Sequence, residues 1–379
     1  MKILLLITKA EIGGAQMSVL GLARELKKSG HDVSVGFGQG DFLFDELAKD
    51  SIPCFRFKNL IRTHNPLKTL AFVLEFKKFL NTNAFDIIHI NSSNALSAGL
   101  ATKLAKNKPR TVFTFRGLSL LDPNYNKNKY LKNIYKIYFK FFLRFIDTGV
   151  FVSKFNYDFA INNNIINKYP KSNTVIVNGI DLVNLKFYEK DYAQKLLADH
   201  LGTSLDDKLI IGSIGRLCYA KNYEFLITIF PKILKHIPNA ILIIIGDGEE
   251  KYNLLKLTKK YNLENNIFFC GSINNASKYI KAFDIFTLPS RYEGLSITLI
   301  EALNAGLPIL ASKVGGNNEL LDNSEAQLFE LNHIHDYVNK LMALATDEGS
   351  RKGIVENNLV LGKKFDIIKT VEKYINIYK

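Results

Sequence analysis

The sequence predicts an α/β protein with two doubly wound domains, each a parallel sheet with helices on both faces. Short runs of Val, Ile and Leu alternate with helical patterns along the chain, which is typical of strands buried on both faces. The strand series stops near residue 179 and resumes near residue 208, and 379 residues exceed what one ordinary core organises. These observations indicate two successive domains.

Six apolar runs make up the predicted sheet of the first domain. They are KILLLI (2–7), HDVSVGF (31–37), FDIIHI (85–90), TVFTF (111–115), TGVFVS (148–153) and TVIVNG (174–179). A helix is expected from Ala15 to Ser29, where a Ser-Gly pair ends it before the second run.

A second set of five runs predicts the sheet of the second domain. They are KLIIGSIG (208–215), AILIIIG (240–246), NIFFCG (266–271), FDIFTLP (283–289) and LPILAS (307–312). The irregular polar segment 178–191 is the expected hinge, which puts the first domain at 1–185 and the second at 186–362. The last helical stretch, 363–379, fits either domain and is a candidate to complete the first.

The composition is that of a soluble globular protein. Hydrophobic residues make up 47% and charged residues 23%, and no uncharged apolar run reaches about 18 residues. The start, MKILLLITKAEIGG, is too short for a signal peptide and contains Glu11. Cys54, Cys218 and Cys270 have neither metal-binding nor disulfide spacing, which fits a reducing cytoplasm.

The positive charge is concentrated in the first half of the chain. Residues 1–185 hold 26 Lys and Arg against 13 Asp and Glu, whereas residues 186–379 hold 24 against 23. This asymmetry indicates a polyanionic partner, either anionic lipid or nucleic acid. A generally basic proteome is the alternative explanation.

The segment 129–147 is predicted to form a basic, aromatic helix. Cations recur at every fourth position and aromatic side chains cover much of the remainder: Lys132, Lys136, Lys140 and Arg144, with Tyr135, Tyr138, Phe139, Phe142 and Phe145. Such helices lie on anionic membrane surfaces, although a core-packed helix with solvated lysines gives the same pattern. We therefore expect a cytoplasmic protein that associates peripherally with the inner face of the cell membrane through its basic half.

Three loops that follow predicted strands are candidate ligand sites, because doubly wound domains bind ligands at the carboxyl ends of their strands. Gly13 and Gly14 open the first helix, so their backbone can approach a phosphate or a sugar, although a tight turn needs the same residues. Arg216 and Lys221 follow the strand 208–215. Two cations there suit a diphosphate leaving group, unless they are only solvated surface cations.

The third loop belongs to the stretch PSRYEGLSITLIEALNAGLPILAS (289–312). Glu293 stands at a helix start, where the helix dipole stabilises a carboxylate by a few tenths to about 1 kcal/mol. Glu301 lies about two turns further on, among apolar residues, where a carboxylate is costly unless something binds it. Two neighbouring hydroxyls, such as those of a ribose, would bind it.

The order of these motifs resembles the retaining glycosyltransferases of family 4, which have the GT-B fold of two Rossmann-like domains facing each other across a cleft. The resemblance covers nearly the full length. Besides the stretch 289–312 it rests on GGAQ (13–16), DIIHIN (86–91), FVSKFN (151–156), VIVNGID (175–181), SIGRL (213–217), IIIGDGEE (243–250), FCGSI (269–273) and VGGNNEL (314–320). Its most specific element is the Glu-x7-Glu pair, Glu293 and Glu301, with Arg216 and Lys221 at the matching spacing.

The resemblance implies a nucleotide-sugar donor as substrate, with no cofactor and no metal. It puts Glu293 against the donor sugar and Glu301 on the ribose, with Arg216 and Lys221 on the phosphates. The other expected donor contacts are the backbone of Gly294, Leu295 and Ser296 on the diphosphate, Gly246, Gly271 and Ser272 beside the base, and Gly13 and Gly14 from the first domain.

Two residues of the first domain depart from, or add to, this pattern. His89 ends a strand where relatives often have a histidine that faces the cleft, so it is a candidate catalytic residue; a structural histidine is the alternative. Arg116, in FTFRGLS, stands where many relatives have a histidine, so no histidine role carries over to that turn. An arginine there suits an anionic acceptor such as a lipid diphosphate.

The activity implied by the resemblance is retaining, metal-independent transfer of a hexose or N-acetylhexosamine. The donor is a nucleotide sugar, with UDP favoured, and the acceptor is a lipid-linked glycan in bacterial surface polysaccharide synthesis (O-antigen, capsule or lipopolysaccharide). One alternative is another GT-B enzyme, such as a sugar-nucleotide epimerase or a phosphorylase. An inactive homologue and a nucleic-acid-binding protein are the others, although the sequence contains no helix-turn-helix, zinc finger or RNA-binding motif.

Overall fold

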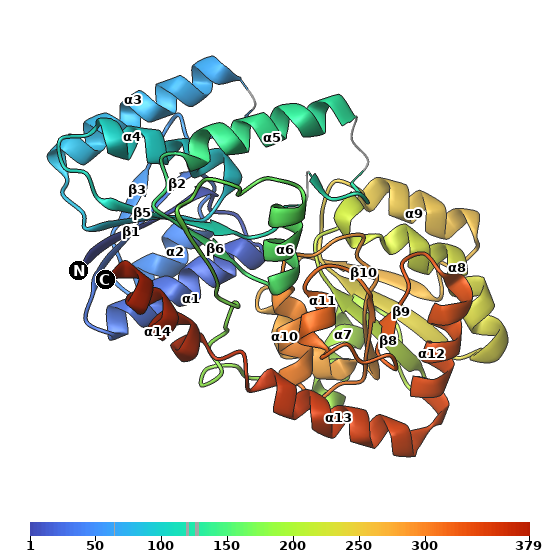
Figure 1. Cartoon of the computed structure of the whole chain (residues 1–379). Coiled ribbons are helices and arrows are strands. Elements are labelled where there is room, and N and C mark those ends of the chain that lie inside the picture. Colours follow the sequence, from blue (N-terminus) through green and yellow to red (C-terminus); the bar gives the residue numbers. More distant parts are fainter. Residues whose placement is uncertain (64, 119–120, 126–128) are drawn as a thin grey trace. The chain divides into compact units, whose positions relative to one another are not determined.

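The computed structural model describes residues 1–63, 65–118, 121–125 and 129–379 (Figure 1). The chain forms two compact units, Met1–Asp181 with Phe365–Lys379, and Leu182–Lys364. Each unit contains one parallel sheet with helices packed on it. The predicted class, two doubly wound α/β domains, is therefore confirmed.

The sheet of the first unit has seven parallel strands in the order β3-β2-β1-β4-β5-β6-β7. The strands are β1 (Lys2–Lys9), β2 (Asp32–Gln39), β3 (Cys54–Arg56), β4 (Ile87–Ile90), β5 (Arg110–Phe115), β6 (Thr148–Phe151) and β7 (Ser172–Val175). From β1 the chain runs outward to β3, then returns to β4 and runs outward to β7. The carboxyl ends of β1 and β4 therefore form the switch point at which doubly wound domains bind ligands.

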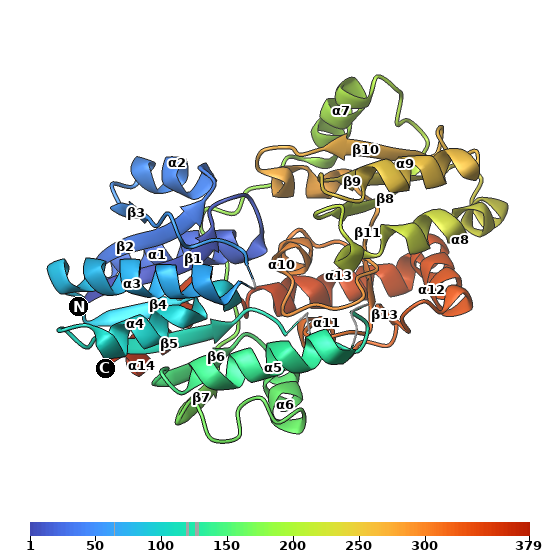
Figure 2. The same cartoon turned by 90° about the horizontal axis from the view of Figure 1, so that it is seen from above.

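Helices cover both faces of the first sheet (Figures 1 and 2). On one face, α1 (Gly14–Lys28), α2 (Phe42–Lys49) and the C-terminal α14 (Ile367–Tyr378) share an apolar core with the strands. On the other face lie α3 (Pro66–Thr82), η1 (Ser93–Ser97), α4 (Ala98–Leu104) and α5 (Lys129–Leu143), with a second core. The helix α6 (Lys154–Asn162) connects β6 to β7.

The sheet of the second unit has six parallel strands in the order β10-β9-β8-β11-β12-β13. The strands are β8 (Leu209–Ile214), β9 (Ala240–Ile245), β10 (Ile267–Gly271), β11 (Ile285–Leu288), β12 (Ile309–Ser312) and β13 (Leu328–Phe329). Here the strand order reverses between β8 and β11, which are paired through Ile211 and Ile285. The loops after these two strands are therefore neighbours.

The helices of the second unit connect its strands and pack on its sheet. They are α7 (Lys190–Leu201), η3 (Tyr219–Lys221), α8 (Tyr223–His236), α9 (Lys251–Lys260), η4 (Ala276–Ala282), α10 (Ile297–Asn304), α11 (Asn317–Leu320), α12 (Ile334–Thr346) and α13 (Glu348–Gly362). The helices α8, α9 and α12 share one core with the sheet, and α10 packs against α13. Within the described ranges, no helix is both long enough and apolar enough to cross a membrane.

Candidate active site

The loops after β8 and β11 bring Lys221 and Glu293 together. Nζ of Lys221 donates a hydrogen bond to Oε1 of Glu293 at 2.7 Å, and Oγ of Ser290 donates to the same oxygen at 2.7 Å. The side chains of Lys221 and Glu293 are 18% and 12% exposed, so water screens their attraction less than it screens a surface pair. This direct contact joins two residues that are 72 positions apart in the sequence.

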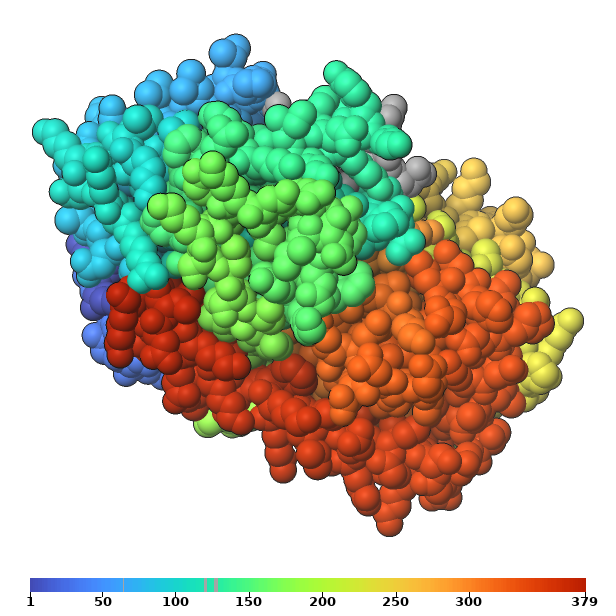
Figure 3. Space-filling model, viewed as in Figure 1, coloured from blue at the N-terminus to red at the C-terminus, as the bar shows by residue number. Residues whose placement is uncertain are grey.

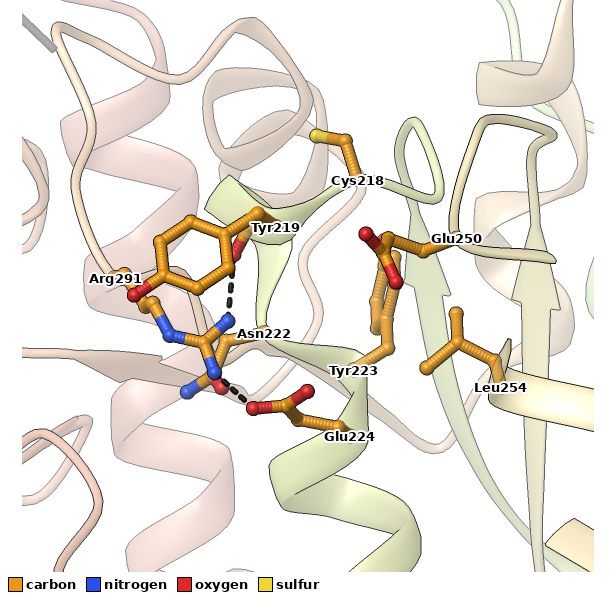
Figure 4. A pocket seen from close by; sticks show the side chains of 8 residues that line it. All are labelled: Cys218, Tyr219, Asn222, Tyr223, Glu224, Glu250, Leu254 and Arg291. Carbon is orange, nitrogen blue, oxygen red and sulfur yellow. Dashed lines mark hydrogen bonds and ion pairs between the residues drawn. The ribbon is translucent and has the colours of Figure 1, made fainter. Parts of the chain in front are cut away.

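Arg291 ties η3 to the loop between β11 and α10. Its backbone N–H donates to the carbonyl of Ala220 at 2.8 Å, and its Nη1 donates to the carbonyl of Tyr219 at 2.6 Å. Its guanidinium also lies 4.1 Å from the centre of the Tyr219 ring and pairs with Glu224 (Figure 4). These contacts fix the segment that carries the lysine to the loop that carries the glutamate.

Asn222 provides a second link between the same two loops. It follows η3 in the left-handed backbone conformation, with φ of 56°, which asparagine tolerates better than most residues. Its buried Nδ2 donates to the carbonyl of Pro289 at 3.1 Å. A small pocket is lined by Asn222, Arg291 and their neighbours, and not by Lys221 or Glu293 (Figure 4). We therefore interpret the residues of this pocket as holding the two loops together, and not as the ligand site itself.

Glu301 is held in α10 without a hydrogen-bonding partner for its carboxylate. The helix begins after Ser296, whose Oγ caps it by accepting from the N–H of Leu299 at 3.3 Å. Across the described ranges of the chain, no donor reaches the carboxylate of Glu301, and burial raises its pKa to about 7. The charged form of this carboxyl group is unfavourable in the protein without a ligand, because nothing donates to it. A ligand with hydroxyl donors would stabilise it.

Two glycines allow neighbouring loops to approach the site closely. Gly315 has φ of +53°, and a Cβ there would lie 2.0 Å from the carbonyl oxygen of Glu293. Gly246 has φ of +151°, and a Cβ there would lie 2.0 Å from the carbonyl oxygen of Gly215. Gly246 also donates its N–H to the carbonyl of Gly271 at 2.8 Å. Gly246, predicted beside the base, thus packs on the loop that follows β8, and Gly271 is linked to Gly246.

The remaining predicted residues of the second unit lie after β8, β10 and β11, and they differ in exposure. Arg216 and Ser272 are exposed, Gly294 is half-buried, and Leu295 is buried. Ser296 is buried as well, and its hydroxyl is engaged as the helix cap, so only its backbone remains for a ligand.

Gly13 and Gly14 lie in the first unit, at the start of α1. Gly13 is the N-terminal cap residue, and no side chain caps this helix end. Their predicted contact with the donor stays a prediction.

His89 is an interior residue, which corrects its predicted catalytic role. It has no exposed surface, its Nδ1 is 2.6 Å from the hydroxyl of Tyr378, and its Nε2 is 2.7 Å from Oγ1 of Thr114. Burial, with a smaller contribution from Arg116, moves the pKa of His89 well below its usual value. A neutral histidine with both ring nitrogens occupied connects β4, β5 and α14, and so acts as a structural residue.

Arg116 is a cation that no carboxylate neutralises among the described residues. Its Nη1 donates to Oδ1 of Asn178 and its Nη2 to Oδ1 of Asn91, both at 2.7 Å, and its Nε is buried without a partner. Burial lowers the pKa of this guanidinium. Since all three residues follow strands of the first sheet, a cationic group with unused donors lies at its carboxyl edge.

Two family models match the chain in succession. The model described as Glycosyltransferase Family 4 matches residues 12–184, and the model described as Glycosyl transferases group 1 matches residues 202–359. The two models together cover most of the chain, which is a glycosyltransferase. The resemblance inferred from the Glu-x7-Glu motif and its neighbours is therefore confirmed, as is the prediction that the chain is an enzyme.

Named relatives and solved structures agree with this family. The glycosyltransferase is 29% identical to the UDP-Gal:alpha-D-GlcNAc-diphosphoundecaprenol alpha-1,3-galactosyltransferase of Escherichia coli, over 87% of the chain and 84% of that protein. It is 28% identical to the N-acetylgalactosamine-N,N'-diacetylbacillosaminyl-diphospho-undecaprenol 4-alpha-N-acetylgalactosaminyltransferase of Campylobacter jejuni, over 80% of the chain and 79% of that protein. It is thus similar to bacterial enzymes that act on lipid-linked sugars.

The fold of the glycosyltransferase is that of solved GT-B structures. Anabaena Alr3699/HepE, crystallised in complex with UDP and glucose, superimposes with a TM-score of 0.82 at 21% identity. The match covers 100% of this chain and 99% of that chain.

Proposed function

We propose that the chain is a retaining glycosyltransferase that moves a hexose or N-acetylhexosamine from a UDP-sugar to a lipid-linked glycan acceptor in bacterial surface polysaccharide synthesis. The observation that carries this proposal is the Lys221–Glu293 pair in the loops beside α10, together with the unpartnered carboxylate of Glu301 on that helix. A fixed ammonium suits phosphate oxygens, and a carboxylate without donors suits ribose hydroxyls.

The cations of the site neutralise the diphosphate in this proposal. The ammonium of Lys221 has three N–H donors and spends one of them on Glu293, so it can hold the glutamate and a phosphate oxygen together. Arg216, exposed in the loop after β8, adds a second cation, and the backbone N–H groups at the start of α10 add neutral donors. Negative charge that develops on the leaving group is stabilised by these fixed groups, so we expect no metal requirement.

The transfer step exchanges one bond at the anomeric carbon of the donor. The bond from C1 to the diphosphate oxygen breaks while the acceptor oxygen bonds to C1 on the same face, and the acceptor proton passes to the departing diphosphate. Glu293 is not assigned as a nucleophile, because its Oε1 already accepts two hydrogen bonds, from Lys221 and Ser290, that hold it in place. We assign it to the orientation of the donor sugar.

An anionic acceptor is supported by Arg116 and by the named relatives. The guanidinium of Arg116 keeps unused donors and has no carboxylate partner in the described part of the chain. The Escherichia coli and Campylobacter jejuni relatives are named for acceptors that carry a diphospho-undecaprenol group. A diphosphate close to the acceptor sugar would provide a negatively charged partner for the guanidinium of Arg116.

The choice of uridine is supported by two comparisons. The Escherichia coli relative is named for UDP-Gal, and Anabaena Alr3699/HepE was crystallised with UDP.

Transfer from labelled sugar nucleotides to a GlcNAc-diphospho-lipid tests this function. We expect label in the lipid fraction with a UDP-sugar, and the same anomeric configuration in product and donor by NMR. An inverted product contradicts the retaining mechanism, and no transfer with any UDP-, GDP- or ADP-sugar contradicts the proposed activity. Conversion of the donor without any acceptor would favour an epimerase.

A further inference from the structure

The guanidinium of Arg116 is held by two amide side chains and not by carboxylates. Arg116 directly follows β5 and is half-buried. Its Nη1 donates to Oδ1 of Asn178 and its Nη2 to Oδ1 of Asn91, both at 2.7 Å. A guanidinium has five N–H donors, and the rest of them, including the buried Nε–H, have no partner in the described ranges. The two asparagines therefore fix the cation without satisfying it.

Asn91 is anchored in the interior of the first unit. It is 1% exposed, and its Nδ2 donates to the carbonyl of His89 at 3.0 Å. Its backbone N–H donates to the carbonyl of Leu6 in β1 at 2.7 Å. His89 is itself held by the hydroxyl of Tyr378, in α14. The amide oxygen that Asn91 offers to the guanidinium thus has a fixed position.

Asn178 is anchored by the C-terminal helix. It is 7% exposed, and Oγ1 of Thr370 donates to the carbonyl of the preceding Val177 at 3.0 Å. Beyond Asn178, the N–H of Ile367 donates to the carbonyl of Ile180 at 2.9 Å. One side of α14 packs in the apolar core, and its outer side forms part of the surface of the first unit (Figure 3). The helix therefore holds the backbone on both sides of Asn178.

A carboxylate in place of either amide would stabilise the folded protein more. Aspartate has nearly the shape of asparagine, and its hydrogen bond to a guanidinium is roughly twice as strong as that of a neutral acceptor. It would also neutralise a cation that burial otherwise makes costly. The chain instead places a neutral acceptor at both positions, so the arginine retains its positive charge.

We propose that Asn91 and Asn178 are positioning residues that hold Arg116 without neutralising it, so that its guanidinium can bind a diphosphate. The inference rests on the anionic acceptor of the proposed function, and it names the residues that keep the charge available for that acceptor. The amide oxygens fix the plane of the guanidinium, and its remaining N–H groups form a fork that matches phosphate oxygens. A purely structural role would explain the two hydrogen bonds but not the use of amides in place of carboxylates.

Two substitutions of Asn178 separate charge from position. Asn178→Asp keeps an acceptor at the same place and adds a counter-charge, so we expect the Tm of the first unit to rise by about 2–4 °C and diphosphate binding to weaken about 30-fold. Asn178→Ala removes the acceptor and leaves the charge, so we expect a Tm lower by about 2–4 °C and binding weaker by only about threefold. A purely structural role predicts the reverse order, with the more stable variant binding better.

Calorimetric titration of geranyl diphosphate into the full chain at saturating UDP measures this binding. The UDP occupies the diphosphate site of the donor, so the probe reports the site of the acceptor. Asn107→Asp is the matched control for the added charge, because Asn107 is exposed and precedes β5, at the opposite edge of the sheet. It should bind the probe as the wild type does. In transfer assays Asn178→Asp should raise KM for the acceptor and leave KM for the donor unchanged.

Arg116→Gln distinguishes failure of the inference from failure of the proposed acceptor. If this variant binds the probe as tightly as the wild type, or if the UDP-saturated wild type binds none, Arg116 is not an anion site and both are wrong. If Arg116→Gln loses binding while Asn178→Asp retains it, the inference alone is wrong. A fall in the Tm of Asn178→Asp, or weaker binding by Asn178→Ala than by Asn178→Asp, also overturns the inference.

Discussion

Glu301→Gln should stabilise the empty protein at alkaline pH, although it removes a residue that we assign to the donor. The carboxylate of Glu301 has no donor among the described residues, and burial raises its pKa from 4.5 to about 7. Between these two values the unfolded chain releases its proton while the folded protein keeps it, so stability falls as the pH rises. Above about pH 7 the folded protein carries the full cost of the charge, which a neutral glutamine does not carry.

The magnitude follows from the size of the shift. A displacement of roughly 2.5 pKa units corresponds to about 3 kcal/mol at about 1.4 kcal/mol per unit. Because the side chain retains some contact with solvent, we take this as an upper limit and expect about 1–3 kcal/mol. For a domain of this size that is a rise in Tm of about 2–10 °C at pH 8, which should shrink towards zero at pH 5.

Differential scanning calorimetry at pH 5 and pH 8 measures this effect. Calorimetry is chosen because the chain contains no Trp whose fluorescence could report unfolding. The two units can melt separately, so the transition of the second unit must be identified first. Glu264→Gln, at an exposed glutamate of the same unit, is the control and should leave Tm unchanged at both pH values. A Glu301→Gln protein that melts at or below the wild-type temperature at pH 8 would refute the reasoning, as would a gain that persists at pH 5.

Further changes test the other parts of the site. Lys221→Ala should lower kcat about 10²- to 10³-fold, while Lys256→Ala on α9 should not; equal kcat in both would exclude the lysine from catalysis. Arg291→Lys should lower the Tm of the second unit by about 2–8 °C, since a lysine cannot reproduce the forked and stacked contacts; an unchanged Tm would contradict its linking role. Arg116→Gln should raise KM for a diphosphate-linked acceptor about tenfold or more, with KM for the donor unchanged; the reverse pattern would place Arg116 on the donor. Addition of EDTA should leave the transfer rate unchanged, and a loss that Mg²⁺ restores would show a metal requirement.

Much of the fold could be predicted because its central strands are continuous apolar runs. Such runs can only be buried on both faces, so β1, β8 and β9 stand out in the sequence within one or two residues of their observed ends. The edge strands β3 and β13 were not predicted. They are three and two residues long, which is too short for any periodicity to show.

Part of the site could be predicted. Its charged residues can be recognised from the local sequence, whereas the contacts that hold them in place cannot. Lys221 and Glu293 stood out as charges in loops after strands, and the structure joins them directly. Arg291 stands in the quoted stretch 289–312 and Asn222 directly follows Lys221, but their role depends on carbonyl groups of a loop that is distant in sequence. A sequence pattern contains no sign of such contacts.

His89 and α5 show where the same reasoning went wrong. His89 was read as facing the ligand because it ends a strand, but Tyr378, from the far end of the chain, packs on it and occupies its Nδ1. The aromatic residues of α5 were expected to be part of its membrane-facing character. Those that the sequence singled out, such as Tyr138 and Phe139, pack on the core instead, whereas Ile134, Ile137 and Phe141 are exposed. Periodicity shows that a helix has two faces, but only the packing shows which face is covered.

Calorimetric titration of UDP into the wild-type protein and the Glu301→Gln variant tests the central claim most directly. Hydrogen bonds to a carboxylate contribute about 1.5–3 kcal/mol, so loss of the charge should weaken UDP binding roughly 10- to 100-fold. Saturable UDP binding that weakens by this factor in the variant is the result we predict. Equal affinity in the two proteins, or no binding of UDP by the wild type, would contradict the assignment of this site to the nucleotide sugar.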